Sequence, residues 1–545
     1  MINFNFIFGT VEDVAGFFVL PSFLNLLKPS HFLLYGYPFG LTESIFSYTE
    51  PLSIFPLYLA SIFLGPVITY NIFVLVTLAL TFLASYKFFT HYIDNSKISF
   101  AMAVLFTTSP YITYHIQSHP QLSQVWLGIG FLIYYFHREK NLKSSLISGL
   151  FLSLVFLTSN YIGFFVGIIC FLYFLLEQLR NLNKNEIKRF IILIFSFIIT
   201  TLPWLISTIK NNQSNYSIEG ALTRPIDDFI TFGSKPWLYI TPPLENPFVG
   251  FIGEKIVLFF KENFTNSWTQ NYFIPEMQSL YFGLSNILIL IIGFRLLKKD
   301  IKVFEQLKNL GIIGIILSVI TLPPYFTVKG ITIYLPSFLI WKIFPMFRVL
   351  ARASIFEYLI LLTIVGVCAT LIIKKYKKIG ILITSALITF SFLEHLIPYK
   401  ITQISETPEI YKYMGKALNK NYSAIIYPQS FTKNYFFWMP THQTPITNPS
   451  GFKFGDFDSN KFTKEINTCE GLKMARYLGV KYLIVYNQEN EVSFFKNNKN
   501  LKQLFKFNES NNLKETNYLL LKINNISYLP ETFLFELEDQ IICEK

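Results

Sequence analysis

The sequence is poor in charged residues and in cysteine for its length. Asp, Glu, Lys and Arg make up 15% of the 545 residues, whereas about 25% is usual in a soluble globular domain. Its four cysteines do not form the framework of a small disulfide-rich domain. These absences exclude an ordinary soluble enzyme and a disulfide-stapled scaffold.

Long apolar runs fill the first four hundred residues instead, and 52% of the chain is hydrophobic. A membrane span needs about 20 apolar residues, somewhat fewer inside a bundle. We therefore predict about ten spans: 67–89, 98–114, 121–136, 145–158, 160–178, 190–209, 280–297, 310–326, 354–373 and 379–397. The apolar stretches 14–27 and 51–64 are shorter, which favours interfacial or re-entrant helices.

The net charge of +12 does not indicate nucleic-acid binding, because basic residues are not gathered with aromatics on one polar face. They lie in loops between the predicted spans, and five clusters fall on one side of the membrane. We take that side as cytoplasmic by the positive-inside rule. The opposite, extracytoplasmic side then carries the long loops 210–279 and 327–352.

Composition divides the chain into three parts. Residues 1–66 form an external acidic segment with the two short apolar helices, 67–398 a helical membrane bundle, and 399–545 a soluble part. The predicted fold is mostly α, with a small extracytoplasmic α/β domain at the C-terminus. In that domain we expect helices at 408–420 and 471–479 and buried strands at 423–428, 482–487 and 518–523.

The cysteines divide between these parts. Cys170 and Cys368 lie in apolar helices and are interpreted as small core hydrophobes. Cys469 and Cys543 share the soluble part and are able to pair, although nothing in the sequence requires it.

Glu12 and Asp13 are the first candidate site residues. Two adjacent carboxylates on the external side suit a general base, or a divalent cation if the protein uses one. The alternative is structural, because Thr10-x-x-Asp13 before an apolar run resembles a capping box at a helix N-terminus.

His115 and His119, in "SPYITYHIQSHPQL", are the second candidates. Imidazoles at a membrane surface donate hydrogen bonds or bind phosphate when protonated. Two histidines without a nearby Cys or carboxylate are a weak metal signal, so we favour contact with substrate. The competing interpretation is a pair of interfacial polar residues in a turn.

Arg348 and Arg352, in "FPMFRVLARAS", are the third candidates. Their spacing of four predicts that both guanidiniums lie on one helix face. The pair lies on the predicted extracytoplasmic side, where the positive-inside rule disfavours basic residues. It therefore indicates a binding site for a phosphate or pyrophosphate headgroup. Snorkelling to lipid headgroups is the alternative.

Three further acids have simpler interpretations. Glu357 lies just inside a predicted span and is expected to pair with Arg352 or another cation. Asp227 and Asp228 in the long external loop are expected to be solvated.

Several motifs occur in an order typical of one superfamily. "YPFG" is followed by "GPVITYN", "SPYITYH…H" and "LTSNYIGFF", and later by "FPMFRVLAR", "HQTPITNPSGF" and "LGVKYLIVY". Together they resemble the GT-C superfamily of multi-pass glycosyltransferases, especially its branch that includes the YfhO-type proteins. The resemblance implies a base near Asp13, although Thr10 stands where relatives often have an acid. Relatives also have a span before this segment, so the resemblance implies an incomplete N-terminus.

The resemblance implies an inverting hexosyl or pentosyl transferase in the plasma membrane. It would move a sugar from a polyprenyl-phosphate carrier to a glycan, lipid or protein acceptor on the extracytoplasmic face. Asp13 and Glu12 would activate the acceptor, and Arg348, Arg352 and His119 would stabilise the departing lipid phosphate, with no organic cofactor. The alternative is a non-enzymatic transporter or assembly factor on the same scaffold.

Overall fold

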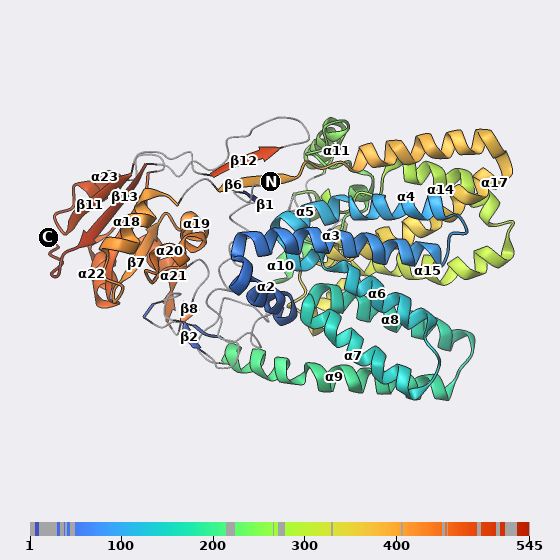
Figure 1. Ribbon diagram of the computed structural model, residues 1–545, viewed down its shortest axis with the longest axis horizontal. Helices are drawn as coiled ribbons and strands as arrows, with labels where there is room; N and C mark the ends of the chain where they lie inside the picture. The colour runs from blue at the N-terminus through green and yellow to red at the C-terminus, as the bar shows by residue number, and fades with distance from the viewer. Residues whose placement is uncertain are drawn as a thin grey trace. The chain divides into compact units, whose positions relative to one another are not determined.

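The computed structural model of the protein describes most of the chain, in two compact units (Figure 1). The described residues are 6–9, 30–32, 37–38, 41–43, 50–213, 224–264, 266–270, 278–328, 331–404, 407–449, 453–454, 456–487, 492–507, 513–517 and 531–543. The helical unit comprises the described residues of 74–202 and 222–398, and the sheet unit those of 1–73, 203–221 and 399–545.

The helical unit is built from long apolar helices joined by short connections. They are α3 (Pro66–Thr90), α4 (Ser96–Thr107), α5 (Pro110–Ser118), α6 (Val125–His137), α7 (Leu142–Thr158), α8 (Asn160–Arg180), α9 (Lys184–Gln213), α14 (Leu284–Leu297), α15 (Ile301–Ile320) and α17 (Ser354–His395), of which α3 and α9 extend into the sheet unit. Polar side chains fix several starts: Asn141 accepts from the Ser144 N–H at 2.8 Å and Asp300 from the Val303 N–H at 3.3 Å. Such N-caps satisfy amide groups that a helix leaves without partners.

Smaller elements lie between the long helices. They are η2 (Pro120–Ser123), α10 (Ile226–Thr231), η3 (Pro236–Ile240), α11 (Gly250–Asn263), α12 (Ser267–Gln270), α16 (Ser337–Ile343), η4 (Leu350–Ala353) and the hairpin of β4 (Tyr325–Val328) with β5 (Ile331–Tyr334).

Each of the ten predicted apolar segments contains helix, but the count of about ten spans is not confirmed. Five helical stretches of the described chain are long and apolar enough to cross a membrane: 67–90, 160–180, 184–207, 301–320 and 350–395. The helices α4, α7 and α14 are apolar but only 12 to 17 residues long. The predicted segment 98–114 is divided between α4, which ends at Thr107, and α5, which begins at Pro110. The stretch 51–64 is the helix α2 (Pro51–Leu64), whereas 14–27 lies outside the described residues.

The stretch 350–395 contains two helical segments. Lys377 has a non-helical backbone, with φ 48° and ψ −120°, which separates 354–376 from 378–395. A Cβ added to Gly380 would lie 2.6 Å from the carbonyl oxygen of Ile372. Residues eight apart in a straight helix are about 12 Å apart along its axis, so the chain doubles back at Lys377.

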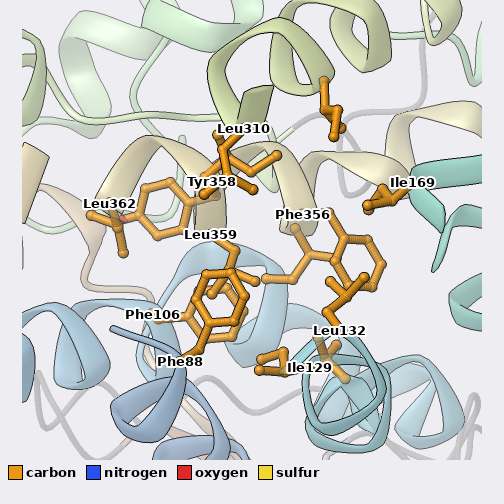
Figure 2. Close-up of a cluster of buried hydrophobic side chains, with 14 of the residues drawn as sticks. Phe88, Phe106, Ile129, Leu132, Ile169, Leu310, Phe356, Tyr358, Leu359 and Leu362 are labelled. Carbon is orange, nitrogen blue, oxygen red and sulfur yellow. The ribbon is translucent and has the colours of Figure 1, made fainter. Parts of the chain in front are cut away.

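The core of the helical unit surrounds the first segment of α17 (Figure 2). Phe356, Leu359 and Leu362 of α17 belong to one buried cluster with Phe106 of α4 and Ile129 of α6. Cys170 and Cys368 are buried and free in this unit, as predicted. Close packing of these apolar side chains fixes α17 as the central helix.

Apolar side chains also cover the outside of the helical unit. Ile191, Phe195 and Ile198 of α9 are exposed, as is Ile315 of α15. A soluble protein rarely presents such continuous apolar surface, which agrees with helices that face lipid.

The sheet unit contains a four-stranded sheet in the order β11 (Leu501–Phe507), β13 (Thr532–Leu537), β10 (Val480–Tyr486) and β7 (Ser423–Tyr427). Strand β10 is parallel to β7 and antiparallel to β13. The expected strands at 423–428 and 482–487 are therefore present, and 518–523 lies outside the described residues.

A second sheet of this unit joins distant parts of the chain. Strand β6 (Lys400–Ile404) lies between β1 (Phe6–Phe8) and β12 (Leu513–Asn517), and both pairings are antiparallel. Two short hairpins pair β2 (Ser30–Phe32) with β3 (Leu41–Glu43) and β8 (Lys453–Phe454) with β9 (Phe457–Asp458).

Helices accompany the four-stranded sheet. They are α18 (Glu409–Ala417), η5 (Gln429–Phe431), α19 (Thr432–Phe437), α20 (Met439–His442), α21 (Ser459–Glu465), α22 (Cys469–Tyr477) and α23 (Val492–Lys496). The helices expected at 408–420 and 471–479 correspond to α18 and α22, the latter beginning two residues earlier.

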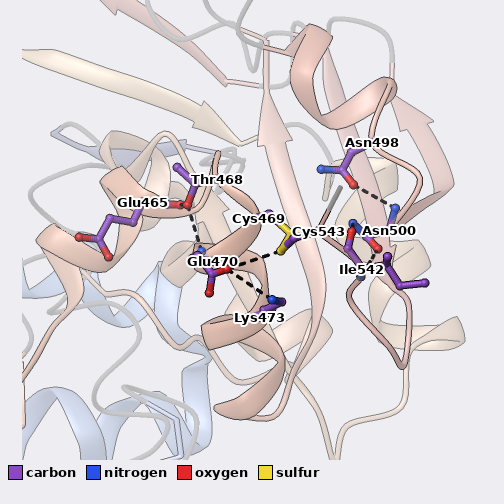
Figure 3. The surroundings of a disulfide bond; sticks show 10 residues. Glu465, Thr468, Cys469, Glu470, Lys473, Asn498, Asn500, Ile542 and Cys543 are labelled. Carbon is purple, nitrogen blue, oxygen red and sulfur yellow. Dashed lines mark hydrogen bonds and ion pairs between the residues drawn. A yellow bond between two sulfur atoms is a disulfide. The ribbon is translucent and has the colours of Figure 1, made fainter. Parts of the chain in front are cut away.

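Cys469 and Cys543 form a disulfide that the sequence left open (Figure 3). Cys469 begins α22, and Cys543 ends the described chain. Asn500 also holds this end, because its side chain exchanges hydrogen bonds of 3.0 Å and 2.8 Å with the backbone of Ile542. The C-terminal residues are thus attached to the unit at two points.

Candidate functional site

The acidic segment lies outside the described residues, so Glu12 and Asp13 keep the roles predicted from sequence. The described candidates belong to the helical unit. They are Arg348 and Arg352 near the start of α17 and the two histidines at the end of α5.

Arg348 is held by an acid from the segment between α9 and α11. Its Nη1 donates to Oδ2 of Asp228 at 2.6 Å, and its guanidinium carbon lies 5.1 Å from the centre of the Phe232 ring. The Arg348 and Asp228 side chains are 32% and 25% exposed. The expectation that Asp228 is merely solvated was wrong, because α10 turns this carboxylate toward Arg348.

A buried lysine stabilises the helix that carries Asp228. Lys235 is fully buried, and its Nζ donates to the carbonyls of Ile230 at 2.7 Å and Thr231 at 3.0 Å. These carbonyls end α10 and lack partners within the helix. Burial lowers the pKa of Lys235 to about 7, so a large share of this amine is neutral near neutral pH.

The backbone after α10 is fixed on two sides. The Ala351 N–H donates to the Phe232 carbonyl at 3.2 Å, and the Ser234 N–H donates to the Thr321 carbonyl at 2.8 Å. The loop that carries Asp228 is therefore bound directly to the segment that carries both arginines.

Arg352 rests on an aromatic ring from α8. Its guanidinium carbon lies 4.6 Å from the centre of the Tyr161 ring. The hydroxyl of Tyr161 accepts from the Val349 N–H and donates to the Met346 carbonyl, both at 3.4 Å. Tyr161 thus supports the backbone between the arginines as well as the charge of one of them.

The two arginines do not share one α-helical face, so the geometric basis of that prediction was wrong. Arg348 lies in irregular backbone after α16, and Arg352 lies in the 3₁₀ helix η4. Tertiary contacts to Asp228 and Tyr161 orient the guanidiniums in place of helical periodicity.

His115 and His119 occupy the end of α5. His115 is fully buried, between the rings of Tyr111 at 4.2 Å and Tyr114 at 5.1 Å. His119 is half-buried, and its Nδ1 lies 3.0 Å from the Ser118 hydroxyl. Their ring centres are 6.0 Å apart. Since α17 neighbours both α5 and η4, it connects the elements that carry the histidines and Arg352.

Glu357 takes part in a buried polar cluster instead of an ion pair. The Thr321 hydroxyl donates to its Oε1 at 3.3 Å, and the Thr321 and Ser234 hydroxyls are 2.7 Å apart. No Lys or Arg of the described chain forms an ion pair with Glu357, which corrects the expected pairing with Arg352. Burial, with the Glu357 charge as a smaller cause, raises the pKa of the nearby Tyr239 hydroxyl well above its usual range.

Sequence reasoning missed Tyr161, Lys235 and Thr321. Tyr161 lies in the motif "LTSNYIGFF", but nothing in that motif predicts a ring beneath a guanidinium. Lys235 in "FGSKPW" has no acidic residue three or four positions away in the sequence, so no local pattern indicates a role for it. Within the described residues, no group of three or more His, Cys, Asp or Glu side chains could hold a metal ion.

The long apolar helices indicate a membrane protein, and its fold resembles that of a solved glycosyltransferase. The arabinofuranosyltransferase AftD from Mycobacteria aligns with a TM-score of 0.55 at 11% identity, covering 98% of this chain and 39% of that chain. The chain therefore spans about two fifths of the length of the enzyme that it matches.

Two weaker likenesses have TM-scores of 0.44. The oligosaccharyltransferase AglB from Archaeoglobus fulgidus, solved with an inhibitory peptide and a dolichol-phosphate, is 10% identical over 88% of this chain and 66% of that one. Apo ArnT from Cupriavidus metallidurans is 8% identical over 99% and 95%.

The family model described as a domain of unknown function, DUF6311, matches residues 28–390. This is well over half of the chain, so the protein belongs to the DUF6311 family. No curated protein sequence matches it. The assignment to the YfhO-type branch stays a prediction.

Proposed function

We propose that the protein is a glycosyltransferase that moves a sugar from a polyprenyl-phosphate carrier to an acceptor on the extracytoplasmic face of the plasma membrane. The main support is the arrangement of Arg348 and Arg352, two guanidiniums oriented by Asp228 and Tyr161 close to the start of a membrane-spanning helix. The fold likeness to AftD agrees with this class of reaction.

The pair suits a phosphate ester at the membrane surface. Arg348 uses one N–H in the described contact with Asp228, and a guanidinium has five N–H donors in a planar fork. The remaining donors match the geometry of phosphate oxygens. Because the Arg348 side chain is about one-third exposed, a ligand can reach it.

The proposed reaction is a single displacement. An acceptor hydroxyl or amide, deprotonated by Asp13 with Glu12 beside it, attacks the anomeric carbon and forms the new glycosidic bond. The bond from that carbon to the lipid phosphate breaks, and the phosphate leaves with the electron pair. Arg348, Arg352 and His119 stabilise the negative charge on the departing phosphate. Attack opposite the leaving group inverts the anomeric configuration.

The disulfide supports the proposed side of the membrane. Disulfides persist in oxidising compartments and are rare in the cytosol, so the pairing of Cys469 with Cys543 agrees with an extracytoplasmic sheet unit.

The test is transfer of a radiolabelled sugar from a polyprenyl-phosphate donor in membranes that contain the protein. We expect Arg348→Ala and Asp13→Asn to lower transfer at least about a hundredfold, the usual effect of removing one charge-stabilising or acid–base group. Transfer at the wild-type rate by both variants would refute this site. Addition of EDTA then shows whether a divalent cation at Glu12 and Asp13 takes part.

A non-enzymatic scaffold gives a different result. The wild-type protein would then bind the lipid phosphate but would transfer no labelled sugar to any glycan, lipid or protein acceptor. Binding that Arg348→Ala abolishes, without transfer by the wild type, would favour a transporter or assembly factor.

A further inference from the structure

The external loop between α15 and α17 contains a β-hairpin with one apolar face. Strands β4 and β5 pair in the register Phe326 with Ile333 and Thr327 with Thr332. Since successive side chains of a strand point to opposite faces, Phe326, Ile331 and Ile333 share one face. Thr327 and Thr332 lie on the other, where their hydroxyls are 3.3 Å apart.

The apolar face is largely uncovered by the protein. Ile331 is 68% exposed and Ile333 44% exposed. Within the described residues its base is packed: the Phe326 ring lies 5.8 Å from the ring of Trp268, whose indole N–H donates to the Tyr325 carbonyl at 2.7 Å. Exposed isoleucines on one face of a hairpin mark an interaction surface.

The helix that follows the hairpin, α16, also exposes apolar side chains. Leu339 and Ile343 of α16 are one helical turn apart, and both are more than 60% exposed. Between them Lys342 is exposed, with its Nζ 4.5 Å from the centre of the Trp341 ring. An indole beside apolar side chains and an adjacent lysine is a composition favoured at the boundary between lipid and water.

The position of the hairpin in the chain limits what can cover it. Helix α15 is a candidate span that ends at Ile320, and its Ile315 and Val319 are exposed as on a lipid-facing helix. Only four residues separate Ile320 from Tyr325, so β4 begins within about 18 Å of the end of the span. The next candidate span begins at Leu350. The hairpin is therefore tethered at both ends to the membrane surface from which α15 emerges.

We propose that the hairpin of β4 and β5, with α16, inserts its apolar face into the adjacent leaflet of the bilayer. The apolar face follows the lipid-facing side of α15 within a few residues of sequence, and the polar face with Thr327 and Thr332 is left to water. Because Phe344 leads directly to the segment that carries Arg348 and Arg352, this insertion sets the depth of both guanidiniums at the membrane surface. The inference goes beyond glycosyl transfer and does not depend on it.

Spin labels on the two faces of β5 test the proposal in the full-length protein. Ile331→Cys and Ile333→Cys are labelled separately, with Thr332→Cys as the matched control on the opposite face of the same strand. Ile315→Cys is the lipid reference, and Lys299→Cys, exposed in the turn between α14 and α15, is the aqueous reference. The native Cys170 and Cys368 are buried, and the unsubstituted parent measures any background label.

The labelled proteins are reconstituted in vesicles of phosphatidylethanolamine and phosphatidylglycerol. Collision with oxygen, which concentrates in lipid, is compared with collision with a water-soluble nickel chelate. We expect the oxygen-to-nickel ratio at positions 331 and 333 to approach that at 315 and to exceed the ratio at 332 severalfold. The second position keeps the test decisive if one substitution prevents folding.

Three results would overturn the proposal. Equal access of the nickel chelate to positions 331 and 332 would mean that the face is in water. Spin–spin broadening at 331 that disappears on dilution with unlabelled protein would mean that a second copy covers it. Protection that develops only when a polyprenyl phosphate is added would identify the face as a site for the carrier lipid instead of the bilayer.

Discussion

Arg348 and Asp228 are 120 positions apart in the sequence, and their side chains meet at 2.6 Å. The contact joins α10 to the segment before α17. It orients the guanidinium before any ligand binds, because the carboxylate and the Phe232 ring restrict its rotation. A group oriented in advance loses less conformational entropy on binding than a freely rotating side chain.

Asp228→Asn should therefore weaken function more than stability. Both side chains are more than one-fifth exposed, and such ion pairs typically contribute up to about 1 kcal/mol. The amide keeps the shape but loses the charge that orients Arg348. In the transfer assay we expect kcat/KM to fall about tenfold, equivalent to about 1.4 kcal/mol, with little change in the unfolding temperature.

Asp227→Asn is the matched control. Asp227 also lies in the first turn of α10 but is exposed. The substitution Asp227→Asn removes the same charge one residue away and should leave the rate of transfer unchanged. If both variants lose activity equally, the effect arises from the net charge of the loop and not from the contact with Arg348.

Lys235 predicts an increase of stability with pH. Its pKa is about 7 in the folded protein, below the ordinary value of 10.5. Between these two values the unfolded chain binds more protons than the folded one, so the free energy of unfolding rises with pH. The limit for one group is about 1.4 kcal/mol per pH unit. We expect the unfolding temperature in detergent to increase from pH 7 to pH 9 through this group.

The comparison that isolates this effect is between the wild type and Lys235→Met. Methionine retains apolar volume but carries no titrating amine, so the variant should show a smaller increase over the same range. It also leaves two carbonyls of α10 without their donor, and its stability at pH 9 should be lower than that of the wild type. Parallel pH profiles for the two proteins would show that Lys235 does not titrate in this window.

The sequence predicted the helices well because hydrophobicity and helix formation coincide in lipid-facing segments. Segment 160–178 became α8 and segment 67–89 became α3. The number of spans was harder to predict, since an apolar segment such as 98–114 contains a break: α4 ends at Thr107, and Ser109 caps the next helix, α5. Two predicted spans, 354–373 and 379–397, do correspond to the two segments separated at Lys377.

The sequence could name candidate site residues one by one but not the residues that contact them. Arg348 and Arg352 attract attention because they stand near a span on the predicted outer side. Their partners Asp228 and Tyr161 come from α10 and α8, at separations that no local pattern encodes. The one-face geometry failed because the chain before η4 is irregular, and helical spacing has no meaning in such a segment.

Gly293 should be intolerant of a larger side chain. A Cβ at this position of α14 would lie 2.3 Å from the Cβ of Cys368 on α17. Small residues allow membrane helices to approach closely, and overpacking typically destabilises by about 1–3 kcal/mol. Gly293→Ala should lower the unfolding temperature in detergent. Gly311→Ala, whose Cβ would meet only Ile364 at 3.9 Å, should have little effect or stabilise α15 slightly. An equal loss in both variants would contradict close packing of α14 on α17.

The disulfide predicts both the stability of the sheet unit and its compartment. Cys469 and Cys543 are separated by 74 positions, and closing a loop of this length stabilises a fold by about 4 kcal/mol in the chain-entropy model. The double substitution Cys469→Ser with Cys543→Ser should destabilise the sheet unit. Cys170→Ala, which leaves the disulfide intact, is the control for cysteine removal.

Thiol counting in cells tests the compartment independently of stability. A sheet unit outside the cytoplasm should give two alkylated thiols in the denatured protein without reductant, from Cys170 and Cys368, and four after reduction. Four thiols without reductant would place the cysteines in a reducing compartment. The proposed orientation, with transfer on the extracytoplasmic face, would then be reversed. The two measurements separate these conclusions, because a stabilising disulfide that forms only after purification would change the unfolding temperature but not the thiol count in cells.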